Sequence, residues 1–158
     1  MKENKTALMT ASDLLLKQDQ SSNHLRRKLA AKKFSESEIN SAIETLQNRN
    51  YLNDEETCRG QFENFYSAEK LSVKQICMKL IQRGFDSEFV KSLIPADYEE
   101  REKKIAARLL EKSFRTTNFE NLDAKEKFKL KSKIYQKLYA KGFSSEIISQ
   151  AMENFFSE

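Results

Sequence analysis

The sequence predicts an all-α protein of three tandem three-helix repeats that form an elongated, curved molecule. Three observations predict this fold. A helical pattern occurs three times, beginning at His24, Gln75 and Lys133. The 158 residues include only three glycines and one proline, too few for the turns of a β-protein. Hydrophobic residues make up 39% and charged residues 33%, a balance typical of amphipathic helices. Tandem repeats of this kind favour a binding protein.

Each copy of the pattern predicts two helices joined by a tight turn. Apolar residues recur four positions apart in the first helix, which places them on one face. A phenylalanine follows that helix, and a short polar residue then provides the N-cap of the next helix. The equivalent residues of the three copies are Leu25, Ile76 and Ile134; Leu29, Leu80 and Leu138; Phe34, Phe85 and Phe143; and Ser35, Asp86 and Ser144.

The residue before each phenylalanine is expected to end its helix in the left-handed conformation. Gly84 and Gly142 stand there in two copies, and glycine adopts this conformation without a steric cost from a Cβ atom. The first copy has Lys33 instead. Its turn is therefore either slightly strained or built differently.

Another helical stretch precedes each copy, so each repeat has three helices. Asn53 or Asp54 can cap the second of these stretches, and Pro95 followed by Asp97 starts the third. The polar segment Arg115–Asp123 is the longest connection. The preceding stretches are Thr6–Lys17, Asp54–Tyr66 and Tyr98–Phe114, and the predicted repeats are residues 1–52, 53–95 and 96–158.

The charge of the chain is mildly basic and unevenly distributed. Lysine and arginine exceed aspartate and glutamate by 28 to 24, a formal charge of +4 that permits a nucleic-acid partner without requiring one. Lysines recur every four residues in the third repeat and predict a basic stripe beside an apolar one. Such a stripe binds phosphates or acidic protein faces, or is simply a solvated surface. These lysines are Lys125, Lys129, Lys133, Lys137 and Lys141.

Other basic residues are weaker candidates for partner or DNA contacts, with a solvated helix surface as the alternative. Tyr135 and Tyr139 lie beside the lysine stripe, where they either stack on bases or, as is more common, pack against the helix. The candidates of the first repeat are Arg26, Arg27, Lys28, Lys32 and Lys33, and those of the second are Lys74, Lys79 and Arg83.

The residue types needed for catalysis or metal binding do not occur at suitable spacings. His24 is the only histidine and is expected at the surface, and Cys58 and Cys77 are expected to be small buried hydrophobic residues with reduced thiols. No glycine-rich phosphate loop or nucleophile–histidine pair occurs. We therefore expect a cytoplasmic protein with no enzymatic activity, no metal, no cofactor and no membrane segment.

Four stretches together resemble the RecX family of bacterial RecA regulators. They are HLRRKLAAKKFSESEI, NRNYLNDEETCRGQF, LSVKQICMKLIQRGF and YAKGFSSEII. The family's Tyr-Leu-Asp-Asp-Glu entry to the second repeat appears as Tyr51-Leu52-Asn53-Asp54-Glu55. Two features depart from the family. The family's common Lys-Gly-Pro is replaced by Lys70-Leu71-Ser72. Positions that often carry basic residues in the family are occupied by Gln61, Asn64 and Ser67.

The resemblance implies a regulatory protein that binds RecA or the RecA–DNA filament. It would modulate, mostly inhibit, recombinase, ATPase and co-protease activities in homologous recombination, DNA repair and the SOS response. We expect a monomer that also binds single- or double-stranded DNA weakly and without sequence preference. The alternatives are a helical DNA-binding module and a protein-interaction scaffold unrelated to RecA. Because the first and third repeats carry most of the charge, we expect them to bind hardest, with the second repeat setting their separation.

Overall fold

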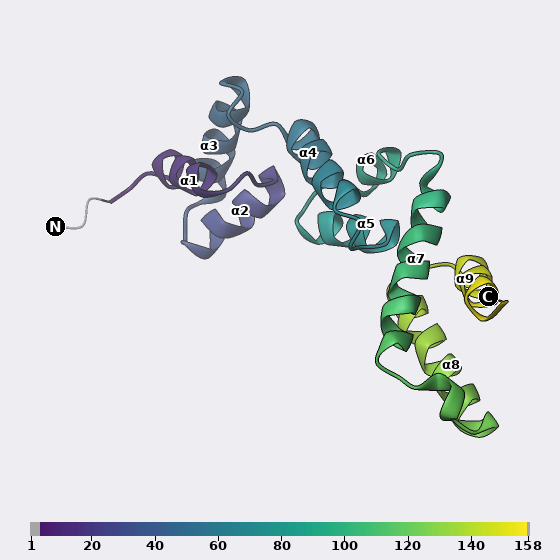
Figure 1. The fold of residues 1–158 in the computed structure, drawn as a ribbon. Coiled ribbons are helices and arrows are strands. Elements are labelled where there is room, and N and C mark those ends of the chain that lie inside the picture. The colour runs from purple at the N-terminus through teal and green to yellow at the C-terminus, as the bar shows by residue number, and fades with distance from the viewer. Residues whose placement is uncertain (1–3, 158) are drawn as a thin grey trace. The chain divides into compact units, whose positions relative to one another are not determined.

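The structure of the chain is a computed structural model that describes residues 4–157, and every regular element in that range is helical (Figure 1). This confirms the predicted all-α fold. No helix in that range is both long and apolar enough to cross a membrane. The elements are α1 (Ala7–Lys17), α2 (Ser22–Ala31), α3 (Glu36–Asn48), α4 (Asp54–Ser67), α5 (Val73–Gln82), α6 (Ser87–Ser92), α7 (Tyr98–Arg115), the 3-10 helix η1 (Phe119–Asn121), α8 (Ala124–Ala140) and α9 (Ser145–Ser157).

The chain divides into two compact units. The first unit comprises the residues up to Glu63 together with Cys77–Leu93, and the second comprises Asn64–Ile76 together with the residues from Ile94 onward. Helices α4 and α5 therefore contribute to both units. Three α-helices fall within each predicted repeat, and we call α1–α3, α4–α6 and α7–α9 the first, second and third repeats; this division remains our proposal.

The first repeat closes around two leucines of α2. Leu25 and Leu29 are fully buried, and each such side chain removed from water contributes about 2 kcal/mol. Helix α3 begins with a capping box, in which the Ser35 side chain accepts from Glu38 N–H and the Glu38 carboxylate accepts from Ser35 N–H. The core of this repeat consists of Ala11, Leu25, Leu29, Ile39, Ile43, Leu46 and Leu52.

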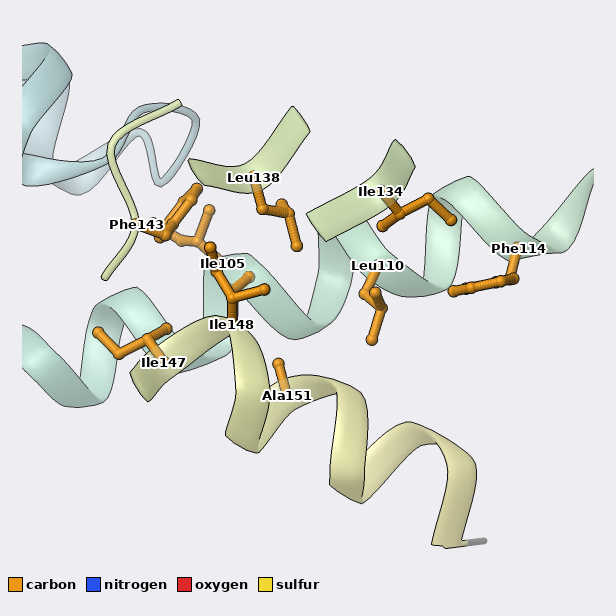
Figure 2. Packing of buried hydrophobic residues seen from close by; sticks show 10 residues of the cluster. Ile105, Leu110, Phe114, Ile134, Leu138, Phe143, Ile147, Ile148 and Ala151 are labelled. Carbon is orange, nitrogen blue, oxygen red and sulfur yellow. The ribbon is translucent and has the colours of Figure 1, made fainter. Parts of the chain in front are cut away.

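The third repeat has its own core between α7, α8 and α9. Figure 2 shows Ile105 and Leu110 of α7 lying close to Leu138 of α8 and Ile148 of α9. All four are at most 2% exposed. The i, i+4 spacing of Ile134 and Leu138 places both on the buried side of α8, as the sequence predicts.

Phenylalanines extend this core toward the connection between α7 and α8. The Phe119 ring of η1 lies edge-on to Phe114 with ring centroids 5.2 Å apart, and Phe114 stacks on Phe155 at 5.0 Å. The Lys131 ammonium lies 3.8 Å from the centroid of the Phe156 ring, a cation–π contact. The connection Arg115–Asp123, predicted only as a polar segment, is thus anchored by an aromatic residue.

A buried ion pair at the start of α7 holds the loop between α4 and α5. Arg101 donates hydrogen bonds to the carbonyl oxygens of Tyr66 at 2.9 Å and Leu71 at 3.0 Å. The neighbouring Glu102 accepts from Val73 N–H at 2.6 Å and pairs with Arg101. Burial raises the pKa of Glu102, against the opposing effects of the Val73 N–H and the Arg101 charge. These two residues are 7% and 3% exposed, so the pair is shielded from water.

Candidate interaction surface

The three turns predicted before the phenylalanines share one backbone conformation. Gly84 and Gly142 have φ angles of 92° and 94°, and Lys33 has a φ angle of 68°. The first turn is therefore built like the others, with the small strain of a non-glycine residue in the left-handed region. Phe85 and Phe143 are buried behind their turns, whereas Phe34 is half-buried.

A serine that caps the middle helix of one repeat binds the turn of the next repeat. Ser21 accepts from His24 N–H at the start of α2, and its hydroxyl donates to the Arg83 carbonyl oxygen. Ser72 stands at the start of α5, where its hydroxyl donates to the Lys141 carbonyl oxygen. Both serines are at most 1% exposed. The same contact is thus made twice, and we call these contacts the first joint and the second joint.

The close approach of these serines gives the two turn glycines a second role. A Cβ atom on Gly84 would lie 2.7 Å from Ser21 Oγ, and one on Gly142 would lie 2.9 Å from Ser72 Oγ. Neither position has room for a larger residue. Lys33 is exposed, so its side chain meets no such restriction.

Basic residues from successive repeats lie together at the first joint. Arg27 Nη2 of α2 would lie only 3.0 Å from a Cβ atom on Gly84, next to Arg83. Burial lowers the pKa of His24, and the nearby charges of Lys28, Arg27 and Arg83 lower it further. The guanidinium of Arg83 also donates to Gln61 Oε1 at 2.6 Å. The joint is thus strongly cationic, although its arginines are separated by 56 positions in the sequence.

Two further predicted basic residues lie at the second joint. The stem of Lys74 in α5 packs where a Cβ atom on Gly142 would stand, with its own Cβ atom 2.9 Å away. Lys141 ends α8, and its carbonyl oxygen accepts the Ser72 hydroxyl. Lys74 is exposed and Lys141 is half-buried.

The other predicted basic residues of the first two repeats are placed as follows. Arg26 donates a hydrogen bond to Asn40 Oδ1 and so links α2 to α3. Lys32 and Lys33 are exposed at the end of α2, and Lys79 is exposed on α5.

The lysine stripe of the third repeat has four exposed members. Lys141 belongs to the second joint, and the four exposed lysines follow one another along α8. The single acid of α8, Glu126, accepts from Asp123 N–H in a capping box. Its carboxylate is therefore engaged at the start of the helix. The four exposed lysines are Lys125, Lys129, Lys133 and Lys137.

Aromatic residues on α8 differ sharply in exposure. Tyr135 packs against the core of the third repeat, in agreement with the packing interpretation. Tyr139 is 60% exposed, so that interpretation is wrong for this residue. Phe128 is 74% exposed and was missed by the sequence analysis. The available signal was its position outside the Ile134 and Leu138 face of the helix.

The residues considered for redox or metal chemistry are placed unfavourably for it. Cys58 and Cys77 are buried free thiols, and burial raises the pKa of Cys58 to about 11. His24, expected at the surface, is half-buried, and its Nδ1 atom has no hydrogen-bond partner. Within residues 4–157, no group of three or more histidine, cysteine, aspartate or glutamate residues is arranged to hold a metal ion.

Comparisons with known proteins agree with this architecture. The family model described as RecX, third three-helix domain, matches residues 99–152. The regulatory protein RecX of Clostridium beijerinckii is 29% identical over 133 residues, which cover 82% of this chain and 58% of that protein. The regulatory protein RecX of Actinobacillus pleuropneumoniae serotype 5b is 37% identical over 81 residues, 51% of this chain and 53% of that protein. The chain thus spans just over half the length of these relatives.

Solved structures show the same fold. The crystal structure of RecX from Lactobacillus salivarius superposes with a TM-score of 0.77 at 20% identity, covering 96% of each chain. A second crystal structure of a regulatory protein RecX has a TM-score of 0.75 at 18% identity and covers 93% of this chain and 70% of that one. The helical repeats, the matched third domain and the relatives along the chain lead to one conclusion: this chain is similar to RecX proteins over most of its length.

Proposed function

We propose that the chain is a regulatory protein that binds RecA or the RecA–DNA filament and mostly inhibits its recombinase, ATPase and co-protease activities. The observation that carries the proposal is that basic residues from successive repeats lie together at the two joints. Arg27 lies near Arg83 at the first joint. At the second joint, Lys74 packs against Gly142, the residue that follows Lys141. The regulatory role follows the names of the relatives, which are regulatory proteins.

The proposed chemistry is binding through positive charge. Guanidinium and ammonium groups attract phosphates and carboxylates, and both kinds of group are exposed on a protein–DNA filament. Contacts made by two joints and by the lysine stripe of α8 would distribute the interaction along the chain. We keep the expectation that the first and third repeats bind hardest, and that the protein acts as a cytoplasmic monomer without catalysis.

DNA binding alone is the second candidate, because cationic joints also suit a phosphate backbone. Glu36, Glu88 and Glu146 stand in the first turns of the last helices of the repeats. Acids there repel phosphates, which disfavours groove reading by these helices. We therefore propose weak, salt-sensitive and sequence-indifferent DNA binding beside the filament interaction.

A titration of RecA ATP hydrolysis on single-stranded DNA tests the proposal. We expect the rate to fall as the chain is added in substoichiometric to stoichiometric amounts. Bare-DNA binding measured at the same salt concentration shows whether the fall is due to competition for DNA. An unchanged rate across a wide concentration range would reject the RecA proposal, and tight sequence-selective binding to DNA would favour the second candidate.

A further inference from the structure

Helix α8 carries a row of side chains that its repeat does not fully bury. Phe128, Ser132, Tyr135 and Tyr139 follow one another at intervals of four, three and four residues, the spacing of one helix face. Phe128 is 74% exposed and Tyr139 is 60% exposed. We call these four residues the α8 aromatic row. Exposed aromatic rings that share a helix face are a feature of binding surfaces, since they gain free energy when a partner removes them from water.

A hollow of about 320 Å³ lies beside the middle of this row. It is lined by Lys131, Ser132, Tyr135, Gln136 and Met152. It is large enough for an apolar side chain of a partner to enter beside α8. The row thus combines projecting rings with a recess, as helix–helix contacts do.

The repeat pattern shows what this face does in the earlier repeats. Ser132 and Gln136 occupy the positions of Asn23 and Arg27 in the first repeat. Asn23 and Arg27 both lie against Gly84, and Asn23 donates to its carbonyl oxygen at 3.0 Å. The corresponding face of α2 therefore contacts the turn of the next repeat through these two side chains, which themselves stay exposed. On α8, the described residues leave Phe128 and Tyr139 largely uncovered.

Helix α8 cannot repeat the serine contact of the joints. Its residue at the position of Ser21 and Ser72 is Leu130, which lies inside the helix because α8 begins at Ala124. The extra helical turns carry Phe128. An occupant of this face would therefore be held by apolar contacts in place of the serine hydrogen bond.

The charge on one flank indicates the chemistry of the occupant. The four exposed lysines of α8 lie beside the aromatic row, and the only acid of the helix is engaged in its capping box. We infer that the α8 aromatic row docks an amphipathic helix of a partner protein, with acidic residues on the side that meets these lysines. The inference rests on the proposed function for the partner, which is RecA within its filament.

A protein helix fits this face better than a nucleic-acid strand. Stacking of successive bases needs open ring faces, and Tyr135 is packed against the core of its repeat. Phe128 and Tyr139 are eleven residues apart, about 16 Å along a helix at 1.5 Å per residue. That spacing matches anchors three helical turns apart on a docked helix.

Binding of the full chain to RecA assembled on poly(dT) tests the inference. Phe128→Ala and Tyr139→Ala are each expected to weaken binding at least about tenfold, as for aromatic anchors at interface centres. Their salt dependence should match the wild type, since no charge is removed. The control is Tyr51→Ala, which truncates a 71% exposed tyrosine outside α8 and should change binding less than about twofold.

Four results would overturn the inference. Wild-type affinity in both α8 variants would show that the row makes no contact. Equal weakening on bare poly(dT) would identify a nucleic-acid occupant. A wild-type dimer in sedimentation that Phe128→Ala dissociates would identify a second copy of the chain. Failure of the wild type itself to bind the RecA filament would reject the proposed function together with this inference, which distinguishes it from the first result.

Discussion

The Ser21 hydroxyl donates a hydrogen bond of 2.5 Å to the carbonyl oxygen of Arg83, 62 residues further along the chain. Ser72 makes the same bond to Lys141. Each serine also accepts a backbone N–H at the start of its own helix, from His24 at 3.1 Å and Gln75 at 3.2 Å. One side chain thus caps a helix and holds the turn of the next repeat. The same serines that cap their helices therefore also help to position the basic residues at the joints.

Removing a joint serine should destabilise the protein more than removing an ordinary cap. Ser21→Ala and Ser72→Ala each lose a cap and leave a buried carbonyl without its partner, at a cost of roughly 2–3 kcal/mol. Ser35→Ala loses only an exposed cap and should cost about 1 kcal/mol. Urea unfolding of the three variants measures the difference. Equal losses in all three would show that the joint bonds add nothing to stability.

Substitutions at the turn residues Gly84 and Lys33 should change the stability of the protein in different directions. Gly84→Ala adds a Cβ atom at positive φ and against Ser21, and should destabilise by roughly 2–4 kcal/mol. Lys33→Gly relieves a strained residue in an open turn, and should be neutral or stabilise by up to about 1 kcal/mol. Thermal unfolding compares the two. A strongly destabilised Lys33→Gly variant would contradict this account of the first turn.

Stability should depend on pH through Glu102. Burial raises its pKa, so the folded state binds the proton more tightly than the unfolded state does. The free energy of unfolding should therefore fall as pH rises from the ordinary glutamate range through the raised folded value. Glu102→Gln keeps an acceptor for Val73 N–H but cannot titrate, so this slope should disappear.

The pH experiment compares urea unfolding from about pH 4 to about pH 7 for the wild type, Glu102→Gln and a control variant. Glu99→Gln, at an exposed position on the same helix, is the matched control and should keep the wild-type slope. A Glu102→Gln variant with the wild-type slope would assign the pH dependence to other groups.

The two thiols should be unreactive in the folded protein. With its pKa raised to about 11, Cys58 is a thiolate in only about one molecule in a thousand at about pH 8. Burial also raises the pKa of Cys77. A chromogenic disulfide reagent should label neither thiol within minutes under native conditions and both in denaturant. Rapid labelling of the native protein would show that α4 and α5 open readily.

The local parts of the fold could be predicted because short-range rules determine them. The Ser35–Glu38 capping box and the left-handed glycines Gly84 and Gly142 are set by residues within a few positions of one another. The burial of Leu25 and Leu29 follows from helical spacing. These signals repeat along the chain, so each copy supports the others.

The candidate surface was only partly predictable, because its contacts join distant residues. Nothing in the local sequence pairs Ser21 with Arg83, because their contact depends on how successive repeats pack. The exposure of Phe128 depends equally on what lies over α8. The packing of the Phe119 ring on Phe114 was also not predicted, because Phe119 lies in a connection that is otherwise polar. Sequence patterns identified the basic residues, and tertiary packing determines which of them lie together.

The measurement that most directly tests the central claim is RecA ATP hydrolysis on single-stranded DNA with wild-type chain and with the triple variant Lys129→Glu, Lys133→Glu, Lys137→Glu. These lysines are exposed, so the variant should keep its helical circular dichroism. We predict that the wild type slows hydrolysis and that charge reversal removes most of this effect, because repulsion replaces attraction. Equal inhibition by both proteins would show that the lysine stripe is a solvated surface, and no inhibition by either would contradict the proposed regulation of RecA.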